Sequence, residues 1–457
     1  MVEDGKQAPL LESIGNKLCR GVEKWMPDPI IFALLLLFGV FILGMTVQEQ
    51  DPYALAGFSY LGFWKLLTFA MQVVLQVVLG FALASHPFIR GGLKLICQWP
   101  SNGKQAAALI ACITLMVSWV YWSLGVVIGA FLAREMAIQA HRRNIPMHYP
   151  VLAVSGYVGL GLIWHWGLSG SAPLMATTDG YAFQKLTGLI PLSETVLHPY
   201  TLINAAIIFV FGVAVMYFLH PRPAGCRGIQ DYVPEALKDE IETVEEKGSQ
   251  VFADRLENSK IIAAITSIIM LTMIIWWFTE KGGLNLNSLN FVFLLLGFAL
   301  YLNPIKYLNA IADSMRAVTG IVIQFPFYAA IMGIMTMSGL ALTIAGWLTA
   351  IATPSTFPVV AWLTGGLVNM FIPSGGGEWV TIGEAINRAA MDLGIAPGQA
   401  LIAYAAGDAW TNMLQPFWAI PLLAITGLKA RNIFGYAIMV WLLATIPFAL
   451  GLSFVPY

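Results

Sequence analysis

The sequence predicts an all-α integral membrane protein built as an inverted repeat, with about nine transmembrane helices, two re-entrant hairpins and two broken helices. Three observations support this fold class. Hydrophobic residues make up 58% of the 457 residues and charged residues only 11%, whereas soluble domains average about 25% charged residues. Apolar segments near the ~20 residues that a bilayer requires recur along the chain. Several are interrupted by glycine and polar residues, which lipid-exposed backbone does not tolerate.

The N-terminal part is expected to stay on the cytoplasmic side of the membrane. Residues 1–29 mix apolar and charged residues, which predicts an amphipathic helix before the first span. Segments 30–47 and 66–85 are the first two crossings. The loop after them carries Arg90, Lys94 and Lys104, so the positive-inside rule places it in the cytoplasm.

The next apolar segment, residues 106–133, is predicted to be a re-entrant hairpin. Basic residues flank it on both sides, and Ser118, Ser123 and Gly125 interrupt it. A single crossing would leave one basic flank outside, whereas a hairpin keeps both flanks inside.

A broken helix completes the first repeat, which covers residues 30–219. Residues 150–175 are apolar but contain five glycines, so we expect a discontinuous crossing here. Residues 200–219 return to the cytoplasm. The polar segment 220–259 is predicted to be a solvated cytoplasmic linker rather than a regulatory module.

The second repeat, residues 284–457, is predicted to follow the same order in the opposite orientation. Residues 260–279 are predicted to form a connecting transmembrane helix, which inverts the second repeat relative to the first. The repeat itself is expected to contain crossings at 289–302 and 320–342, an amphipathic connector at 304–316, a hairpin at 357–387, a broken helix at 399–426 and a last crossing at 433–455. Residues 152–177 align with 401–426 without a gap. Inverted repeats with discontinuous helices are typical of secondary transporters.

The segment 373–379 carries the strongest functional signal. Three consecutive glycines, each costing roughly 1 kcal/mol in a helix, lie beside the carboxylate of Glu378. Helix N-termini exposed at such breaks donate N–H groups and carry partial positive charge. They can hold a carboxylate where no Lys or Arg lies near the middle of a span. The predicted substrate-binding residues are Trp122, Ser123, Gly125, His165, Ser169, Gly170, Ser171, Ser374, Gly375, Gly376, Gly377, Glu378, Trp379, Thr411, Asn412 and Gln415.

Three ionisable residues are candidates for coupling to an ion gradient: His165, Glu378 and Asp408. Intramembrane acids are costly and therefore default to functional roles. A Na⁺ site near Asn369, Asp408 and Asn412 is a further possibility. The structural alternatives are a satisfied core histidine, an aspartate that caps a broken helix, and serines that only permit close packing. No cofactor is expected, and the net charge of −1 argues against a nucleic-acid partner.

Seven motifs, in order along nearly the whole chain, resemble the short-chain fatty acid transporter family. They are Trp-Met-Pro-Asp-Pro at 25–29, Gly-Ala-Phe-Leu-Ala-Arg-Glu at 129–135, Gly-Leu-Ser-Gly-Ser-Ala-Pro-Leu at 167–174, Arg-Leu-Glu-Asn-Ser at 255–259, Gln-Phe-Pro-Phe-Tyr at 324–328, Pro-Ser-Gly-Gly-Gly at 373–377 and Gly-Asp-Ala-Trp-Thr-Asn at 407–412, running into Gln-Pro at 415–416. The resemblance implies a carboxylate bound between two hairpin tips, often beside Na⁺. It also implies a multi-pass protein of the bacterial inner membrane and commonly a homodimer.

We therefore expect a secondary transporter of acetoacetate, butyrate and similar monocarboxylates, and not an enzyme. Proton symport is the first expectation for coupling, Na⁺ symport the second and a passive channel the third. A carrier for dicarboxylates would need a second cationic anchor. The N-terminus is expected in the cytoplasm and the C-terminus outside. The predicted walls for the alkyl chain are Trp122, Trp164, Trp379, Trp410 and Phe417.

Overall fold

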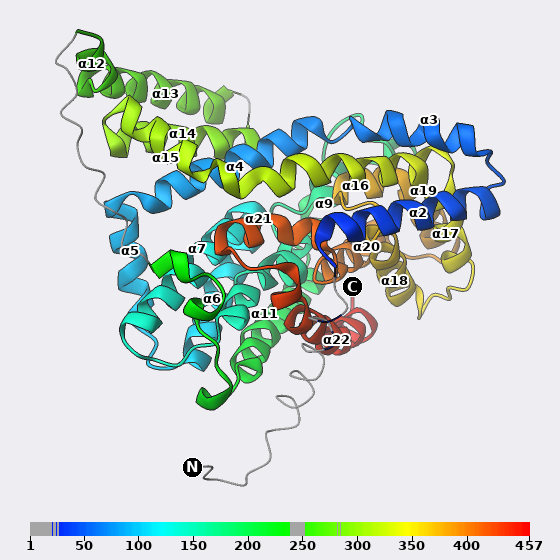
Figure 1. The fold of residues 1–457 in the computed structure, drawn as a ribbon. Helices are drawn as coiled ribbons and strands as arrows, with labels where there is room; N and C mark the ends of the chain where they lie inside the picture. Colours follow the sequence, from blue (N-terminus) through cyan, green and yellow to red (C-terminus); the bar gives the residue numbers. More distant parts are fainter. Residues whose placement is uncertain (1–20, 22–23, 25–26, 238–251, 281, 284) are drawn as a thin grey trace.

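The computed structural model describes residues 21, 24, 27–237, 252–280, 282–283 and 285–457 (Figure 1). Most of the predicted N-terminal helix and residues 238–251 of the linker lie outside these ranges. Within them all regular structure is helical, and nine segments are long and apolar enough to cross a membrane. The chain is therefore an all-helical membrane protein.

The first half contains the following elements, in chain order: α2 (Pro29–Val47), α3 (Pro52–Phe63), α4 (Leu67–Ser85), α5 (Pro87–Cys97), α6 (Gly103–Val120), α7 (Trp122–Arg142), α8 (Tyr149–Ser155), the π-helix η1 (Gly159–Ile163), the 3-10 helix η2 (Trp164–Trp166), α9 (Ser171–Ala176), α10 (Gln184–Thr187), η3 (Leu192–Glu194) and α11 (Pro199–Leu219). Three short 3-10 helices follow: η4 (Pro223–Gly225), η5 (Ile229–Asp231) and η6 (Pro234–Leu237).

The second half continues with α12 (Phe252–Glu257), α13 (Lys260–Glu280), α14 (Leu286–Tyr301), α15 (Pro304–Ser314), η7 (Met315–Val318), α16 (Thr319–Met337), α17 (Leu340–Thr349), α18 (Phe357–Asn369), α19 (Gly375–Asp392), α20 (Pro397–Thr411), α21 (Pro416–Thr426) and α22 (Ala430–Phe454). Figure 1 shows α13, α14 and α15 together at one end of the molecule and α17 near the other end.

The first predicted hairpin is a pair of antiparallel helices, α6 and α7, joined at Tyr121. Gly125 faces Ser118 across the pair, and a Cβ at Gly129 would lie 2.7 Å from Thr114 Oγ1. The interruption itself lies between Ser118 and Ser123, which are inside the two helices. Gly125 also lies inside α7, and its contact with Ser118 lets the two helices approach closely. With 18 and 21 residues, α6 and α7 are each long enough to cross a bilayer.

The second predicted hairpin consists of α18 and α19, with residues 370–374 between them. Gly375, Gly376 and Gly377 were expected to interrupt the helix, but they form the first turn of α19 instead. Ser374 makes this start possible, because its hydroxyl accepts the Gly377 N–H at 3.3 Å and caps the helix.

Two other boundaries differ from the prediction. The predicted crossing 320–342 ends at Met337, because Gly339 takes a left-handed conformation with φ 80° and starts the separate helix α17. Helix α3 was not predicted. It packs against α16, where Gly62 and Gly333 meet backbone to backbone.

Both broken helices are present at the predicted places. The first runs through α8, η1 and η2 to an extended stretch at 167–170 and resumes as α9. The second is α20 followed, after residues 412–415, by α21. We call residues 167–170 the first break and residues 412–415 the second break. The order of hairpin, broken helix and closing helix thus occurs twice, ending in α11 and in α22.

Candidate functional site

The tip of the first hairpin is bound to the first break. The Leu168 N–H donates to Trp119 O at 2.7 Å, and the Trp122 N–H at the start of α7 donates to Ser169 Oγ at 3.0 Å. Gly167 is required here because a Cβ would overlap the Trp119 carbonyl. These bonds supply partners to backbone groups that the interrupted helices leave open.

The tip of the second hairpin is bound to the second break in the same manner. Asn369 Nδ2 lies 2.9 Å from Asp408 O, 3.0 Å from Thr411 Oγ1 and 2.7 Å from Asn412 Oδ1. Gln415 Nε2 donates to Met370 O at 2.7 Å. Each hairpin tip is therefore tied to the break of the broken helix that follows it in sequence.

The first broken helix also contacts the second broken helix and its break. Tyr157, between α8 and η1, donates its hydroxyl to Asn412 O at 2.5 Å. His165 Nε2 in η2 lies 3.5 Å from Asp408 Oδ1 in α20. Met413 packs onto Gly161, where a larger residue would not fit. Polar groups from both halves of the chain thus gather at one place in the interior.

Three ionisable side chains form the centre of this place: His165, Asp408 and Glu378. They are 1%, 0% and 0% exposed. The two carboxyl groups are close enough to interact directly. Within the described ranges no hydrogen-bond partner reaches either imidazole nitrogen or any of the four carboxylate oxygens. We call these three residues the central cluster.

Burial with no partner outside the cluster itself constrains what the central cluster can do. A buried charge is stable only when it is paired or coordinated, and otherwise it is neutralised by a proton. Two adjacent buried acids cannot both be ionised without a counter-charge. The cluster is therefore suited to take up and release a proton as its surroundings change.

The start of α19 lies against His165 and Asp408 of the central cluster. The starts of α7, α9 and α21 lie nearby. Trp122 of α7 packs on Trp418 of α21 with 5.3 Å between ring centroids. Gly376 of α19 faces Met175 and Ser171 of α9. Helix N-termini carry partial positive charge, so this arrangement favours an anion although, among the described residues, no Lys or Arg belongs to it.

Glycine lets α19 reach the cluster. A Cβ on Gly375 would overlap the His165 ring and lie 3.0 Å from Asp408 Oδ2, and one on Gly376 would lie 2.9 Å from Met175 Sδ. The Tyr404 hydroxyl donates to Gly375 O at 3.2 Å and fixes this turn from the side of α20.

An aromatic triangle forms the apolar side of the site. The centroid distances are 4.8 Å between Trp122 and Trp164, 5.3 Å between Trp122 and Trp418, and 5.1 Å between Trp164 and Trp418. Trp164 also packs on the His165 ring at 4.2 Å. An apolar surface therefore borders the polar cluster directly.

Most of the predicted site residues lie at the two tips, at the two breaks or within two residues of them, or in the first turns that start there. They are Trp122, Ser123, His165, Ser169, Gly170, Ser171, Ser374, Gly375, Gly376, Gly377, Glu378, Thr411, Asn412 and Gln415. Gly125 instead packs against Ser118 within the hairpin. Trp379 packs on Tyr404 and Phe183.

Trp410, one of the predicted wall residues, packs among other aromatic residues. Trp410 packs on Trp362 and Trp441, and its ring N–H donates to Trp441 O at 3.0 Å. Trp418 is the third member of the aromatic triangle, and neither it nor Tyr157 was predicted from the sequence. The polar partner of Tyr157 is a backbone carbonyl more than 250 positions away, and no local sequence pattern indicates such a pair.

The comparisons with known proteins agree on one family. A family described as "Short chain fatty acid transporter" matches residues 10–455. A candidate short-chain fatty acid transporter of Escherichia coli K12 is 34% identical over 447 residues, which cover 97% of this chain and 100% of the relative. Its counterpart in Haemophilus influenzae Rd is 32% identical over 456 residues, with 97% and 100% coverage.

Two solved structures also align with the chain. MtrF of Neisseria gonorrhoeae, from a class of antimetabolite efflux pumps, has 16% identity and a TM-score of 0.44, covering 95% of this chain and 96% of that one. The YdaH transporter of Alcanivorax borkumensis has 16% identity and a TM-score of 0.40, with 97% coverage of both chains.

Proposed function

The chain belongs to the short-chain fatty acid transporter family, and from this premise we propose that it carries acetoacetate, butyrate and similar monocarboxylates by proton symport. The family is one of transporters, not enzymes. The observation that supports the coupling is the central cluster, which places two buried acids and a histidine at the start of α19 and near the starts of α7, α9 and α21.

The carboxylate of the substrate is proposed to bind at the N-termini of α7 and α19. The hydroxyls of Ser123 and Ser374 and the first amides of α19 are the donors. A bound anion would lie near Asp408 and Glu378 and would be repelled if they were ionised. A proton that enters with the substrate removes this repulsion, so anion and proton bind favourably together. This mutual dependence is the physical basis of symport.

The apolar part of the substrate is proposed to lie against Trp122, Trp164 and Trp418. Burial of each CH₂ group contributes roughly 0.8 kcal/mol. Affinity should therefore rise from acetate to butyrate until the space beside the tryptophans is filled. Because short-chain acids are almost fully ionised at pH 7, their anions need such a carrier to cross the membrane.

Sodium symport is the second candidate. Asp408 O, Thr411 Oγ1 and Asn412 Oδ1 converge on one point, as the oxygens of a Na⁺ site would. That point is occupied by Asn369 Nδ2, at 2.7 to 3.0 Å from each oxygen. Sodium could bind there only after the Asn369 amide had moved, which is why we place H⁺ first. A passive anion channel, the third candidate, would show no counterflow.

Uptake into proteoliposomes separates these candidates. The purified protein is reconstituted, and labelled butyrate uptake is driven either by an inward proton gradient without Na⁺ or by an inward Na⁺ gradient at equal pH. We expect the proton gradient alone to drive accumulation, and Asp408→Asn and Glu378→Gln to abolish accumulation. Accumulation with Na⁺ alone would exclude proton symport, and absence of butyrate counterflow would exclude the carrier.

The orientation of the chain and its assembly belong to the same proposal. We propose a bacterial inner-membrane protein with the N-terminus in the cytoplasm and the C-terminus outside, in which the repeat of residues 284–457 is inverted relative to that of residues 30–219. A homodimer is proposed from the family resemblance alone.

A further inference from the structure

The motif Gln-Phe-Pro-Phe-Tyr at 324–328 lies inside α16, and the proposed transport mechanism uses none of its residues. Phe325 of this motif stacks on Phe417 of α21 with 4.1 Å between ring centroids. Tyr328 packs on the same Phe417 ring at 5.1 Å. The motif therefore packs α16 against the start of α21, directly after the second break.

Tyr328 carries a polar group that the fold itself does not use. Its side chain is 0% exposed, and among the described residues no hydrogen-bond partner reaches its hydroxyl. A buried hydroxyl without a partner loses the hydrogen bonds that water supplies to it in the unfolded chain, and such groups are rare in folded proteins. A phenylalanine would fill the same space without this cost. The hydroxyl is therefore suited to a partner that arrives with a ligand.

Two further contacts place Tyr328 beside the proposed substrate site. Its hydroxyl is close enough to that of Tyr157 for the two groups to interact electrostatically, and Tyr157 donates to Asn412 O in the second break. Met332 lies one turn beyond Tyr328 on the same face of α16, and its Sδ is 3.9 Å from the position of a Cβ on Gly377. Gly377 belongs to the first turn of α19. Tyr328 therefore lies between the second break and the proposed donors of the substrate carboxylate.

We propose that Tyr328 determines specificity by donating a hydrogen bond to the oxo oxygen of a short-chain 3-oxo acid, such as acetoacetate. The role of Tyr328 rests on the proposed function, because the acid is one that binds at the start of α19. In acetoacetate a single CH₂ group separates the oxo group from the carboxylate. A residue that recognises the oxo oxygen must therefore lie close to the donors of the carboxylate, as Tyr328 does.

Butyrate is the matched ligand without this oxygen. It has the same number of carbon atoms as acetoacetate and the same charge at pH 7, but it would leave the Tyr328 hydroxyl buried and unpaired. A site built to hydrogen-bond a polar group of its substrate discriminates strongly against an analogue that lacks the group. The wild type should therefore prefer acetoacetate to butyrate, and the preference should depend on the hydroxyl.

Competition for uptake into proteoliposomes tests the role of Tyr328. Unlabelled acetoacetate and unlabelled butyrate each compete with labelled butyrate, and the ratio of their half-inhibitory concentrations measures the preference. We expect the wild type to prefer acetoacetate by roughly tenfold or more. Tyr328→Phe should lower this preference by roughly tenfold or more, because acetoacetate inhibits less well while butyrate inhibits at least as well as before.

Tyr307→Phe is the control variant. Tyr307 is also buried, at 1% exposure, but it belongs to α15, which Figure 1 shows at one end of the molecule. The change removes a hydroxyl from a buried tyrosine away from the proposed site, so the preference should stay at the wild-type value.

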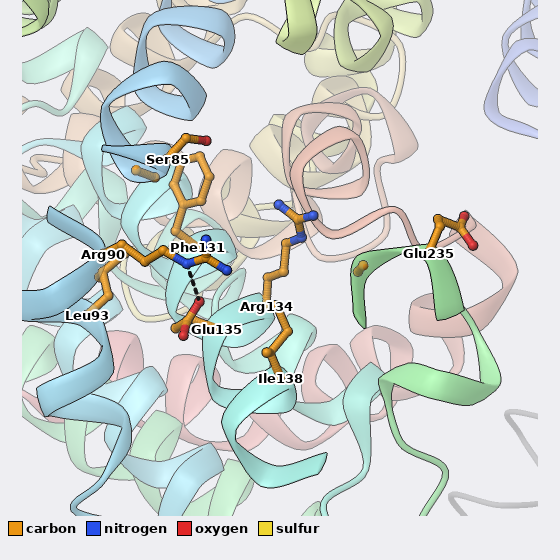
Figure 2. A pocket seen from close by; sticks show the side chains of 10 residues that line it. Ser85, Arg90, Leu93, Phe131, Arg134, Glu135, Ile138 and Glu235 are labelled. Carbon is orange, nitrogen blue, oxygen red and sulfur yellow. Dashed lines mark ion pairs between the residues drawn. The ribbon is translucent and has the colours of Figure 1, made fainter. Parts of the chain in front are cut away.

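The competition also separates the proposed site from a charged pocket of about 120 Å³, which Figure 2 shows. Arg90, Arg134 and Glu135 are among its lining residues, and the lining comes from the end of α4, from α5, from α7 and from η6. Acids that bound there would contact these elements and not α16. Their binding would therefore not respond to Tyr328→Phe.

An unchanged preference in Tyr328→Phe would overturn the role of Tyr328, and so would an equal loss of preference in Tyr307→Phe. Tryptophan-fluorescence melting monitors folding. Should Tyr328→Phe not fold, the wild type decides: if it binds butyrate as tightly as acetoacetate, the hydroxyl does not select an oxo acid. A wild type that takes up neither acid would contradict the proposed transport function itself, which separates that failure from a failure of the role of Tyr328 alone.

Discussion

Gly375 is the single residue on which the packing of the central cluster depends most directly. An added Cβ would overlap the His165 ring and approach Asp408 Oδ2 to 3.0 Å. Both neighbours are fully buried, and a close-packed interior cannot absorb the extra methyl group without displacing them. The α19 terminus would then move away from the site that it is proposed to form.

We expect Gly375→Ala to lower butyrate uptake in proteoliposomes at least tenfold. Gly39→Ala is the matched control, because Gly39 lies inside α2 and an added Cβ there meets no atom within 4 Å. Its uptake should stay within twofold of the wild type. Equal uptake by both variants and the wild type would show that α19 does not contact His165 in the transport site.

At the scale of elements, two histidines hold the start of the first broken helix. The His148 N–H donates to His220 Nε2 at 3.0 Å, and the Arg227 N–H donates to His148 Nδ1 at 3.0 Å. His148 Nε2 lies 2.9 Å from the Tyr436 hydroxyl, and His220 Nδ1 lies 2.9 Å from Pro221 O. Each imidazole accepts a backbone N–H, so both rings must be neutral in the folded protein.

This arrangement predicts that acid destabilises the fold. Burial, with the nearby His220 and Arg227, lowers the pKa of His148 to about 3. Burial, with Lys104, lowers the pKa of His220 to about 4. Because unfolded histidines titrate near pH 6.5, the unfolded state binds more protons below that value. The stabilisation is complete above pH 6.5 and is lost progressively toward pH 4.

Thermal unfolding in detergent measures this effect. The melting temperature of the wild type should fall as the pH is lowered from 7.5 to 4.5. His148→Gln should lower it already at pH 7.5 and make its pH dependence shallower. His141→Gln, which alters an exposed histidine at the end of α7, should retain the wild-type profile. A His148→Gln profile parallel to that of the wild type would contradict the assignment.

The sequence predicted the hairpins and the broken helices from the interruptions in its apolar segments. Glycine and polar residues inside apolar runs indicated both hairpins and both breaks, because lipid excludes unpaired backbone. The position of the turn at Tyr121 was missed because tyrosine is no turn residue. The turn there depends on two bonds to the first break, in which the Trp122 N–H donates to Ser169 and Trp119 O accepts from the Leu168 N–H. Tertiary contacts, not local preference, determine that boundary.

At the scale of the whole molecule, the central cluster exists only because the two halves face each other. His165 comes from the first half, and Asp408 and Glu378 from the second. Each of the three residues is recognisable in the sequence as an ionisable group within an apolar segment. Their mutual contact could not be predicted, because it depends on how η1 and η2 cross α20. For the same reason Trp418 was missed as the third member of the aromatic triangle.

The proposed inverted arrangement of the two halves leads to a topology experiment. Ser101 precedes the first hairpin and Ser355 precedes the second, and both are exposed. They occupy equivalent places in the repeat. Inversion puts them on opposite sides of the membrane, with Ser101 on the cytoplasmic side beside Lys104, whereas two parallel repeats would put them on the same side.

Single cysteines at these positions distinguish the two arrangements. In a variant whose four native cysteines are replaced by serine, Ser355→Cys should react with a membrane-impermeant maleimide added to intact cells that have a permeabilised outer membrane. Ser101→Cys should react only after the inner membrane is opened, and total labelling in detergent serves as the control for both. Labelling of both positions from the same side would rule out inversion. The two halves would then have equal orientation. In that case α7 and α19 could not present their N-termini to one anion from opposite sides of the bilayer.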